Sequence, residues 1–80
     1  MATIKIRLYE LLQEKMKRDG RDPSSNPITQ EELATTLGIS RPTVGSYMKN
    51  RPDRLNIEIL IKFCEYFDCD LSDLLVLERQ

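Results

Sequence analysis

The side chains best suited to chemistry fall in one short segment that ends at Lys49. Arg41, Pro42, Gly45, Ser46 and Lys49 stand at i, i+1, i+4, i+5 and i+8, a spacing that places them on one face of a helix. That face is small and polar, and it carries a cation at each end. A helix that enters the major groove of DNA needs hydrogen-bonding groups near its N-terminal end and nothing bulky in the middle of its outward face. The pattern therefore favours contact with base edges.

Each residue of this face suits a particular contact. Arg41 can bind guanine through a bidentate pair of hydrogen bonds to O6 and N7, and Ser46 can hydrogen-bond to a base edge. Pro42 and Gly45 can pack on a thymine methyl. Glycine at an exposed mid-helix position costs up to about 1 kcal/mol relative to alanine, and a close approach to DNA would explain it. The same residues are also compatible with an ordinary solvated face on which Pro42 merely begins the helix.

The composition gives little support to catalytic or metal chemistry. The chain has 80 residues, with no His and two Cys. Without histidine, a Ser-His-Asp or Cys-His site cannot form, and two cysteines cannot supply the four ligands of a structural zinc. Neither a nucleophile–base pair nor a phosphate-cradling glycine loop is present. We therefore expect no enzyme activity, no cofactor and no bound metal.

The charges divide the chain into a basic part and an acidic part. The net charge is -1, from 12 Lys and Arg against 13 Asp and Glu. Residues 1–54 hold ten basic and seven acidic side chains, whereas residues 55–80 hold two basic and six acidic ones. Since a partner meets one face of a protein rather than its net charge, the slight overall acidity does not exclude a polyanionic partner.

The spacing of apolar residues predicts one all-α domain, residues 1–80, with five short helices. Residues 2–7 and the end of the chain near residues 76–77 suggest short N- and C-terminal β-strands that can pair. No apolar run approaches a membrane span, and the N-terminus has no signal-peptide core, so we expect a cytoplasmic protein. The helices are expected at about residues 7–18, 30–37, 41–49, 57–67 and 71–75.

The second and third helices are expected to form a helix-turn-helix corner. Thr29 and Glu32 match a capping box, in which the threonine hydroxyl caps the Glu32 amide and the Glu32 side chain returns to the Thr29 amide. Gly38 supplies the positive φ that the three-residue turn requires, and Ser40 caps the next helix. Small Ala34 suits the closest contact between the helices. Apolar side chains close the corner: Leu33, Leu37, Ile39, Val44 and Tyr47.

Aromatic and sulfur-containing side chains are expected to be structural. Buried, inert thiols are the expectation for Cys64 and Cys69, because acidic neighbours surround them and a reactive thiol needs an electropositive site. Four aromatic residues are expected in the core or at its edge: Tyr9, Phe63, Tyr66 and Phe67.

The central segment, TQEELATTLGISRPTVGSYMKN, resembles the lambda-repressor-like (Cro/cI-type, Xre family) helix-turn-helix transcriptional regulators. The preceding IRLYELLQEKM and the following NIEILIKFCEYFDCDLSDLL are similar to the first, fourth and fifth helices of that family. The chain departs from the family pattern in its longer loop 19–28 and at Arg51-Pro52-Asp53. The resemblance implies a five-helix DNA-binding domain with a helix-turn-helix core at about residues 29–49 and a recognition helix at about residues 41–49.

The residues and the resemblance together predict sequence-specific binding of double-stranded DNA by a small transcriptional regulator. Arg41, Pro42, Gly45 and Ser46 are expected to face base edges. Contacts to phosphate, which set the register of a protein on DNA, are expected from a second group: Gln30, Thr43, Lys49 and Arg51.

A homodimer is expected because one helix-turn-helix module buries only about 600–1,000 Å² on DNA. Two modules related by a two-fold axis read half-sites about 10–10.5 base pairs apart. The terminal segments, with Ile4, Ile6 and residues 75–77, offer apolar surface for this contact. Their strands can pair within one chain or between two chains.

The alternative function is a protein-interaction module, antitoxin-like or adaptor, that keeps the helix-turn-helix scaffold. The acidic part of the chain, residues 55–80, is its main support. Such a module predicts a contiguous apolar patch away from Arg41, whereas DNA binding predicts positive potential on the face that carries Arg41, Lys49 and Arg51.

Overall fold

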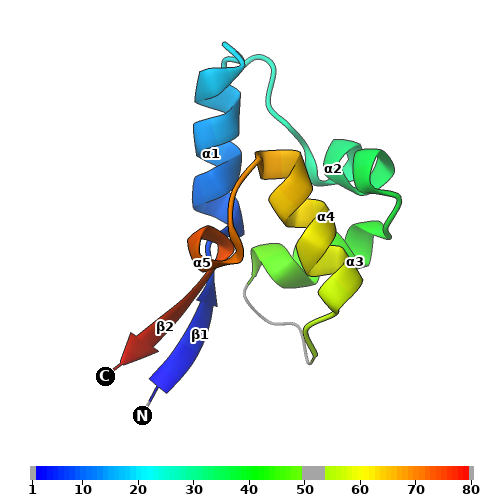
Figure 1. Cartoon of the computed structure of the whole chain (residues 1–80). Coiled ribbons are helices and arrows are strands. Elements are labelled where there is room, and N and C mark those ends of the chain that lie inside the picture. Colours follow the sequence, from blue (N-terminus) through cyan, green and yellow to red (C-terminus); the bar gives the residue numbers. More distant parts are fainter. Residues whose placement is uncertain (1, 50–53, 80) are drawn as a thin grey trace.

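The computed structural model describes residues 2–49 and 54–79 and shows five helices with one two-stranded antiparallel ribbon (Figure 1). The chain is therefore mostly helical, and the expected terminal strands are present and pair within one chain. The predicted turn at residues 50–53 lies outside the described residues. In chain order the elements are β1 (Ala2–Ile6), α1 (Leu8–Arg18), α2 (Gln30–Leu37), α3 (Arg41–Met48), α4 (Ile57–Phe67), α5 (Leu71–Leu74) and β2 (Leu75–Arg79).

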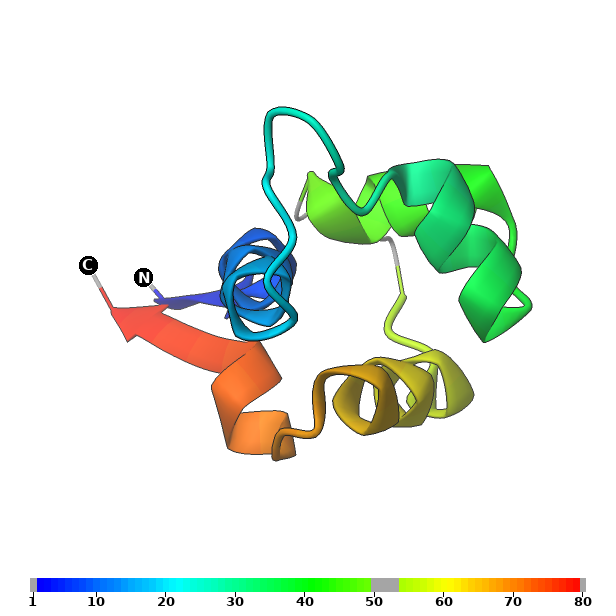
Figure 2. The same ribbon diagram turned by 90° about the horizontal axis from the view of Figure 1, so that it is seen from above.

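The ribbon of β1 and β2 projects away from the helices (Figures 1 and 2), and the pair of Ala2 and Arg79 forms its outer end. Ile6 lies opposite Leu75, and Ile4 lies opposite Leu77. Cross-strand partners share a face of a sheet, so one apolar face runs from the core towards the tip. Ile6 is buried, whereas Ile4 and Leu77 are about half exposed.

Side-chain caps begin the helices where the sequence predicts them. The Thr29 hydroxyl accepts a hydrogen bond from the Glu32 amide at 3.0 Å, and the Ser40 hydroxyl accepts one from the Thr43 amide at 3.2 Å. Gly38 ends α2 in the left-handed conformation, with φ 68° and ψ 34°. The positive φ expected of the turn is therefore confirmed at Gly38, where glycine meets no steric penalty.

Two details of the expected elements are wrong. The returning half of the capping box is absent, because both Glu32 carboxylate oxygens accept hydrogen bonds from Arg21 instead of from the Thr29 amide. A charged guanidinium is the stronger donor and displaces the neutral amide. The fifth helix ends at Leu74, and Leu75 is already the first residue of β2, where it pairs with Ile6.

The core is one cluster of buried apolar side chains to which every helix contributes. The Tyr47 and Phe63 rings pack with their centroids 5.4 Å apart, and the Phe63 and Phe67 rings 6.5 Å apart, so α3 and α4 share one aromatic row. Tyr66 is half-buried at the edge, as expected. Tyr9 is 57% exposed, so its expected place in the core is wrong. None of the described helices is long and apolar enough to span a membrane.

Candidate nucleic-acid interface

The corner between α2 and α3 is held by buried side chains and by the turn between the two helices. Leu33, Val44 and Tyr47 are each 2% exposed or less, and small Ala34 is 5% exposed. The Ile39 amide donates to the Ala34 carbonyl at 3.0 Å, which closes the C-terminus of α2. These contacts fix the angle at which α3 presents its outward face.

A second support holds the far end of α3. The buried Tyr47 hydroxyl accepts a hydrogen bond from the Asn56 amide at 3.1 Å. Asn56 also caps α4, because its side chain accepts from the Glu58 and Ile59 amides. One tyrosine therefore connects α3 to the start of α4, and its ring packs on Phe63.

The outward face of α3 forms an open hollow of about 590 Å³. Every one of the four expected base-contact residues lines it, together with two of the four expected phosphate-contact residues. The lining residues are Gln30, Arg41, Pro42, Gly45, Ser46 and Lys49. The helical spacing that groups five of these residues in the sequence is therefore confirmed as one surface, and Gln30 joins them from α2.

Small residues of α3 line the middle of the hollow. Gly45 and Ser46 are half-buried in it, while Arg41 and Lys49 are exposed at its two ends. A Cβ atom placed on Gly45 would lie 3.5 Å from Oε1 of Gln30. The Gln30 amide therefore lies against the glycine in the middle of the face.

The two remaining expected phosphate contacts lie elsewhere. The Thr43 hydroxyl is 2.6 Å from the Ser40 hydroxyl, and the Thr43 amide donates to the same Ser40 oxygen. Thr43 therefore belongs to the cap of α3 and does not line the hollow. Arg51 lies outside the described residues.

The cations at the two ends of the hollow are electrostatically available. Arg41 and Lys49 form no ion pair with any residue that the structure describes, whereas Lys5, Lys15 and Arg21 each pair with a carboxylate. A cation without an internal partner keeps its full attraction for a polyanion. The face around α3 therefore carries uncompensated positive charge.

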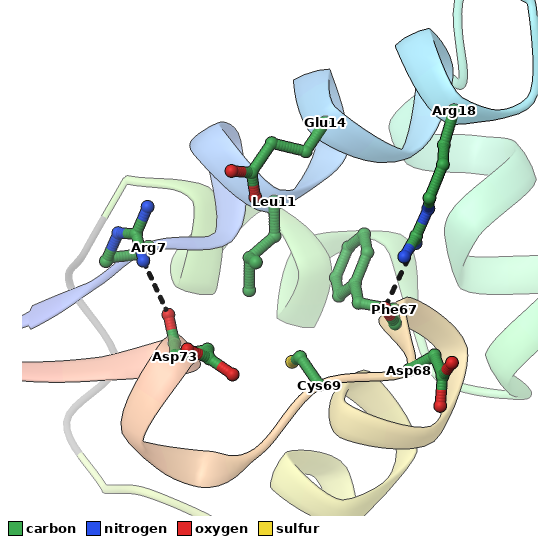
Figure 3. Close-up of a pocket in the computed structure, with 8 residues that line it drawn as sticks. All are labelled: Arg7, Leu11, Glu14, Arg18, Phe67, Asp68, Cys69 and Asp73. Atoms are coloured by element: carbon green, nitrogen blue, oxygen red, sulfur yellow. Dashed lines mark hydrogen bonds between the residues drawn. The ribbon is translucent and has the colours of Figure 1, made fainter.

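A second hollow, of about 390 Å³, lies between α1 and the α4–α5 connection (Figure 3). Its two arginines serve the fold: Arg7 donates to the Asp73 carbonyl at 3.2 Å, and Arg18 donates to the Phe67 carbonyl at 3.1 Å. Both carbonyls lie at the C-termini of short helices, where cations are favourable. These arginines clamp α1 to α4 and α5.

The thiol of Cys69 lines this second hollow. Burial raises the pKa of Cys69 to about 11, and the adjacent Cys64 thiol contributes further. The thiolate is the effective nucleophile, so the raised pKa agrees with the expectation of an inert thiol. Both cysteines are half-buried rather than fully buried.

Two features of the corner are not apparent from the sequence. Arg21 bridges the loop before α2 to Glu32, at 2.8 and 3.0 Å, and also donates to the carbonyls of Asn26 and Pro27. Opposite charge suggests that Arg21 forms an ion pair, but it does not indicate which of the 13 acidic residues is the partner. The approach of Gln30 to Gly45 has no local sequence signal, because the two residues lie on different helices.

Comparison with known proteins places the chain in a family. The Cro/C1-type HTH DNA-binding domain matches residues 25–80. Among solved structures, the fold is similar to the crystal structure of the transcriptional regulator VanUg, form II. The TM-score is 0.62 at 20% identity, and the match covers 99% of this chain and 89% of that chain. A likeness at this identity shows the fold alone. A search of curated proteins found no match.

Proposed function

The chain belongs to the family of Cro/C1-type helix-turn-helix DNA-binding domains, and we propose that it binds double-stranded DNA sequence-specifically as a small cytoplasmic transcriptional regulator. In this proposal α3 lies in the major groove. The observation that carries it is the single hollow on α3 lined by Gln30, Arg41, Pro42, Gly45, Ser46 and Lys49. Small residues at its centre leave room for base edges, and the cations at its ends are unpaired within the described residues.

The proposed contacts divide into readout and positioning. Arg41 reads guanine, Ser46 hydrogen-bonds to a base edge, and Pro42 and Gly45 pack on thymine methyls. Lys49 neutralises phosphate at the opposite end of the helix. Thr43 lies in the first turn of α3, where the amide groups and the dipole of the helix favour a phosphate. Arg51 is assigned to phosphate from the sequence alone.

Selection of bound duplexes from a random pool tests this function. We expect enrichment of one motif that contains a guanine at a fixed position. A variant with both Arg41→Ala and Lys49→Ala is expected to bind every duplex more weakly and to enrich a motif that lacks the fixed guanine, while it keeps the fold because both side chains are exposed. Recovery of unenriched sequences by the natural chain would contradict specific binding.

We also propose that the regulator acts as a homodimer on an inverted repeat. The support is the projecting ribbon, in which Ile4 and Leu77 lie opposite each other and are 47% and 50% exposed. An isolated two-stranded ribbon is marginal in water, so contact between two such ribbons would stabilise both. The interface is then built from the terminal segments and leaves α3 free.

An adaptor that keeps this scaffold is the second candidate. Its specific support is a cluster of exposed apolar residues at the start of α4: Leu55 at 42%, Ile57 at 74% and Ile61 at 51% exposure. Ile57 and Ile61 lie one helical turn apart and so share a face. An adaptor that does not bind DNA would enrich no motif in the selection, and Ile57→Ser together with Ile61→Ser would abolish binding to its protein partner.

A further inference from the structure

Gln30 occupies an unusual position for a residue expected to contact phosphate. It is the first residue of α2, yet its side chain lies over the middle of α3, against Gly45. Oε1 of Gln30 lies 3.5 Å from the position that a Cβ atom added to Gly45 would occupy. Gln30 is also the one residue of α2 that lines the hollow. Its amide therefore lies against the middle of the outward face of α3.

The fold leaves the Gln30 amide unused. Its neighbours at the corner are engaged: Thr29 and Ser40 cap helices, and Glu32 accepts from Arg21. In the described part of the chain, no hydrogen bond involves the Gln30 side chain. A carboxamide carries both a donor and an acceptor, and both are open here.

The chemistry of an open carboxamide distinguishes two ligands on DNA. A phosphate offers only acceptors, so it engages the amide nitrogen and offers the carbonyl oxygen no partner on the DNA. The major-groove edge of adenine offers the N6 donor and the N7 acceptor side by side, which matches both groups of glutamine. A position over the middle of the base-facing surface favours the second ligand.

We propose that Gln30 reads an adenine in the major groove beside the base contacted by Arg41, and that Gly45 is the residue that makes room for it. The proposal rests on the proposed DNA-binding function. A methyl group at position 45 fits, because 3.5 Å is an ordinary van der Waals distance. A larger side chain would fill the space that the amide occupies. Specificity is then set by two helices of the corner rather than by α3 alone.

Two substitutions of Gln30 test the assignment on the selected duplex and on a panel in which each base pair is changed in turn. Gln30→Ala is expected to lose about 5- to 150-fold in discrimination at one A·T pair while it keeps its preference at every other position. Gln30→Glu is expected to move the preference at that pair to C·G, because a carboxylate accepts from cytosine N4. Both variants should fold, since alanine favours helices and an acidic residue suits a helix N-terminus.

The role of Gly45 gives an independent arm of the same experiment. Gly45→Ala is expected to retain the preference at the A·T pair, because its methyl group leaves room for the Gln30 amide. Gly45→Leu is expected to lose that preference together with affinity for every duplex, because its side chain also fills the base-facing surface. Gln13→Ala is the matched control, because it removes a glutamine amide from α1, outside the hollow. Circular dichroism and thermal unfolding confirm the fold of each variant.

The outcomes separate this inference from the function on which it rests. A uniform loss of affinity on every duplex for Gln30→Ala would show a phosphate contact and overturn the inference. Unchanged affinity and preference would place Gln30 off the DNA and also overturn it. Failure of the natural chain to prefer any duplex would instead overturn the proposed function itself.

Discussion

Arg21 and Glu32 form a bidentate ion pair, with the two guanidinium nitrogens 2.8 and 3.0 Å from the two carboxylate oxygens. Arg21 lies in the loop that follows α1, and Glu32 lies in the first turn of α2. The same guanidinium also donates to the carbonyls of Asn26 and Pro27. The long loop is therefore tied to the helix that carries Gln30, and the pair positions the start of the corner.

Glu32→Gln is expected to lower the melting temperature at pH 7 and low salt. The hydrogen bond from Arg21 lowers the pKa of Glu32 below its ordinary value of 4.5. A carboxyl group whose pKa is lower in the folded than in the unfolded chain stabilises the fold when the pH is above the unfolded pKa. That stabilisation is lost as the pH falls through the pKa of the folded protein. The difference between the two proteins should therefore shrink below about pH 4, and also in high salt because the pair is partly solvated. A difference that is constant from pH 7 to pH 3 would exclude this mechanism.

Substitution of two glycines by alanine is expected to shift stability in opposite directions. Gly38 has φ 68°, so Gly38→Ala should destabilise the fold by about 1 kcal/mol through backbone strain alone. Its new Cβ would meet only Lys62 Nζ at 4.0 Å. Gly45 lies inside α3, so Gly45→Ala should stabilise the fold by up to about 1 kcal/mol. Urea unfolding of both variants measures the signs, and two shifts in the same direction would contradict the assignment.

The helix-turn-helix corner could be predicted from the sequence because its determinants are local. Thr29 and Ser40 cap the helices that immediately follow them, and Gly38 ends α2 as its position after Leu37 indicates. The grouping of Arg41, Gly45 and their neighbours follows from helical spacing within one element, which needs no tertiary information.

The features that could not be predicted depend on contacts between separate elements. The partner of Glu32 is Arg21, eleven residues earlier, rather than the backbone of its own helix. Tyr9 lies on α1 at a position that the neighbouring elements leave exposed. The distance between Gln30 and Gly45 depends on the angle between α2 and α3, which no sequence pattern specifies.

Lys49→Ala is expected to weaken binding to all duplexes about equally. If Lys49 neutralises one phosphate, the slope of log K against log salt should become less steep by about 0.9. Lys17→Ala is the matched control, because it removes an exposed positive charge from α1, outside both the hollow on α3 and the ribbon. Affinities from fluorescence anisotropy at several salt concentrations give the slope. An unchanged slope for Lys49→Ala would remove this residue from the phosphate contacts.

Replacement of Leu77 is expected to dissociate the proposed dimer without unfolding the chain. Leu77 is 50% exposed near the tip of the ribbon, so Leu77→Lys removes apolar surface and adds like charges across a two-fold contact. Sedimentation equilibrium at tens of micromolar protein should show dimers for the natural chain and monomers for the variant. A purely monomeric natural chain, both free and on its best duplex, would contradict the dimer and leave a single half-site binder.

If the outward face of α3 reads base edges, replacement of Arg41 at its N-terminal end must change the sequence preference. The measurement is the affinity of the natural chain and of Arg41→Ala for the selected duplex and for each of its single-base-pair variants. We expect Arg41→Ala to lose about 1–3 kcal/mol on the selected duplex and to lose its preference at one G·C pair, with the other preferences intact. Unchanged affinity and an unchanged pattern of preferences would contradict the placement of this face on DNA.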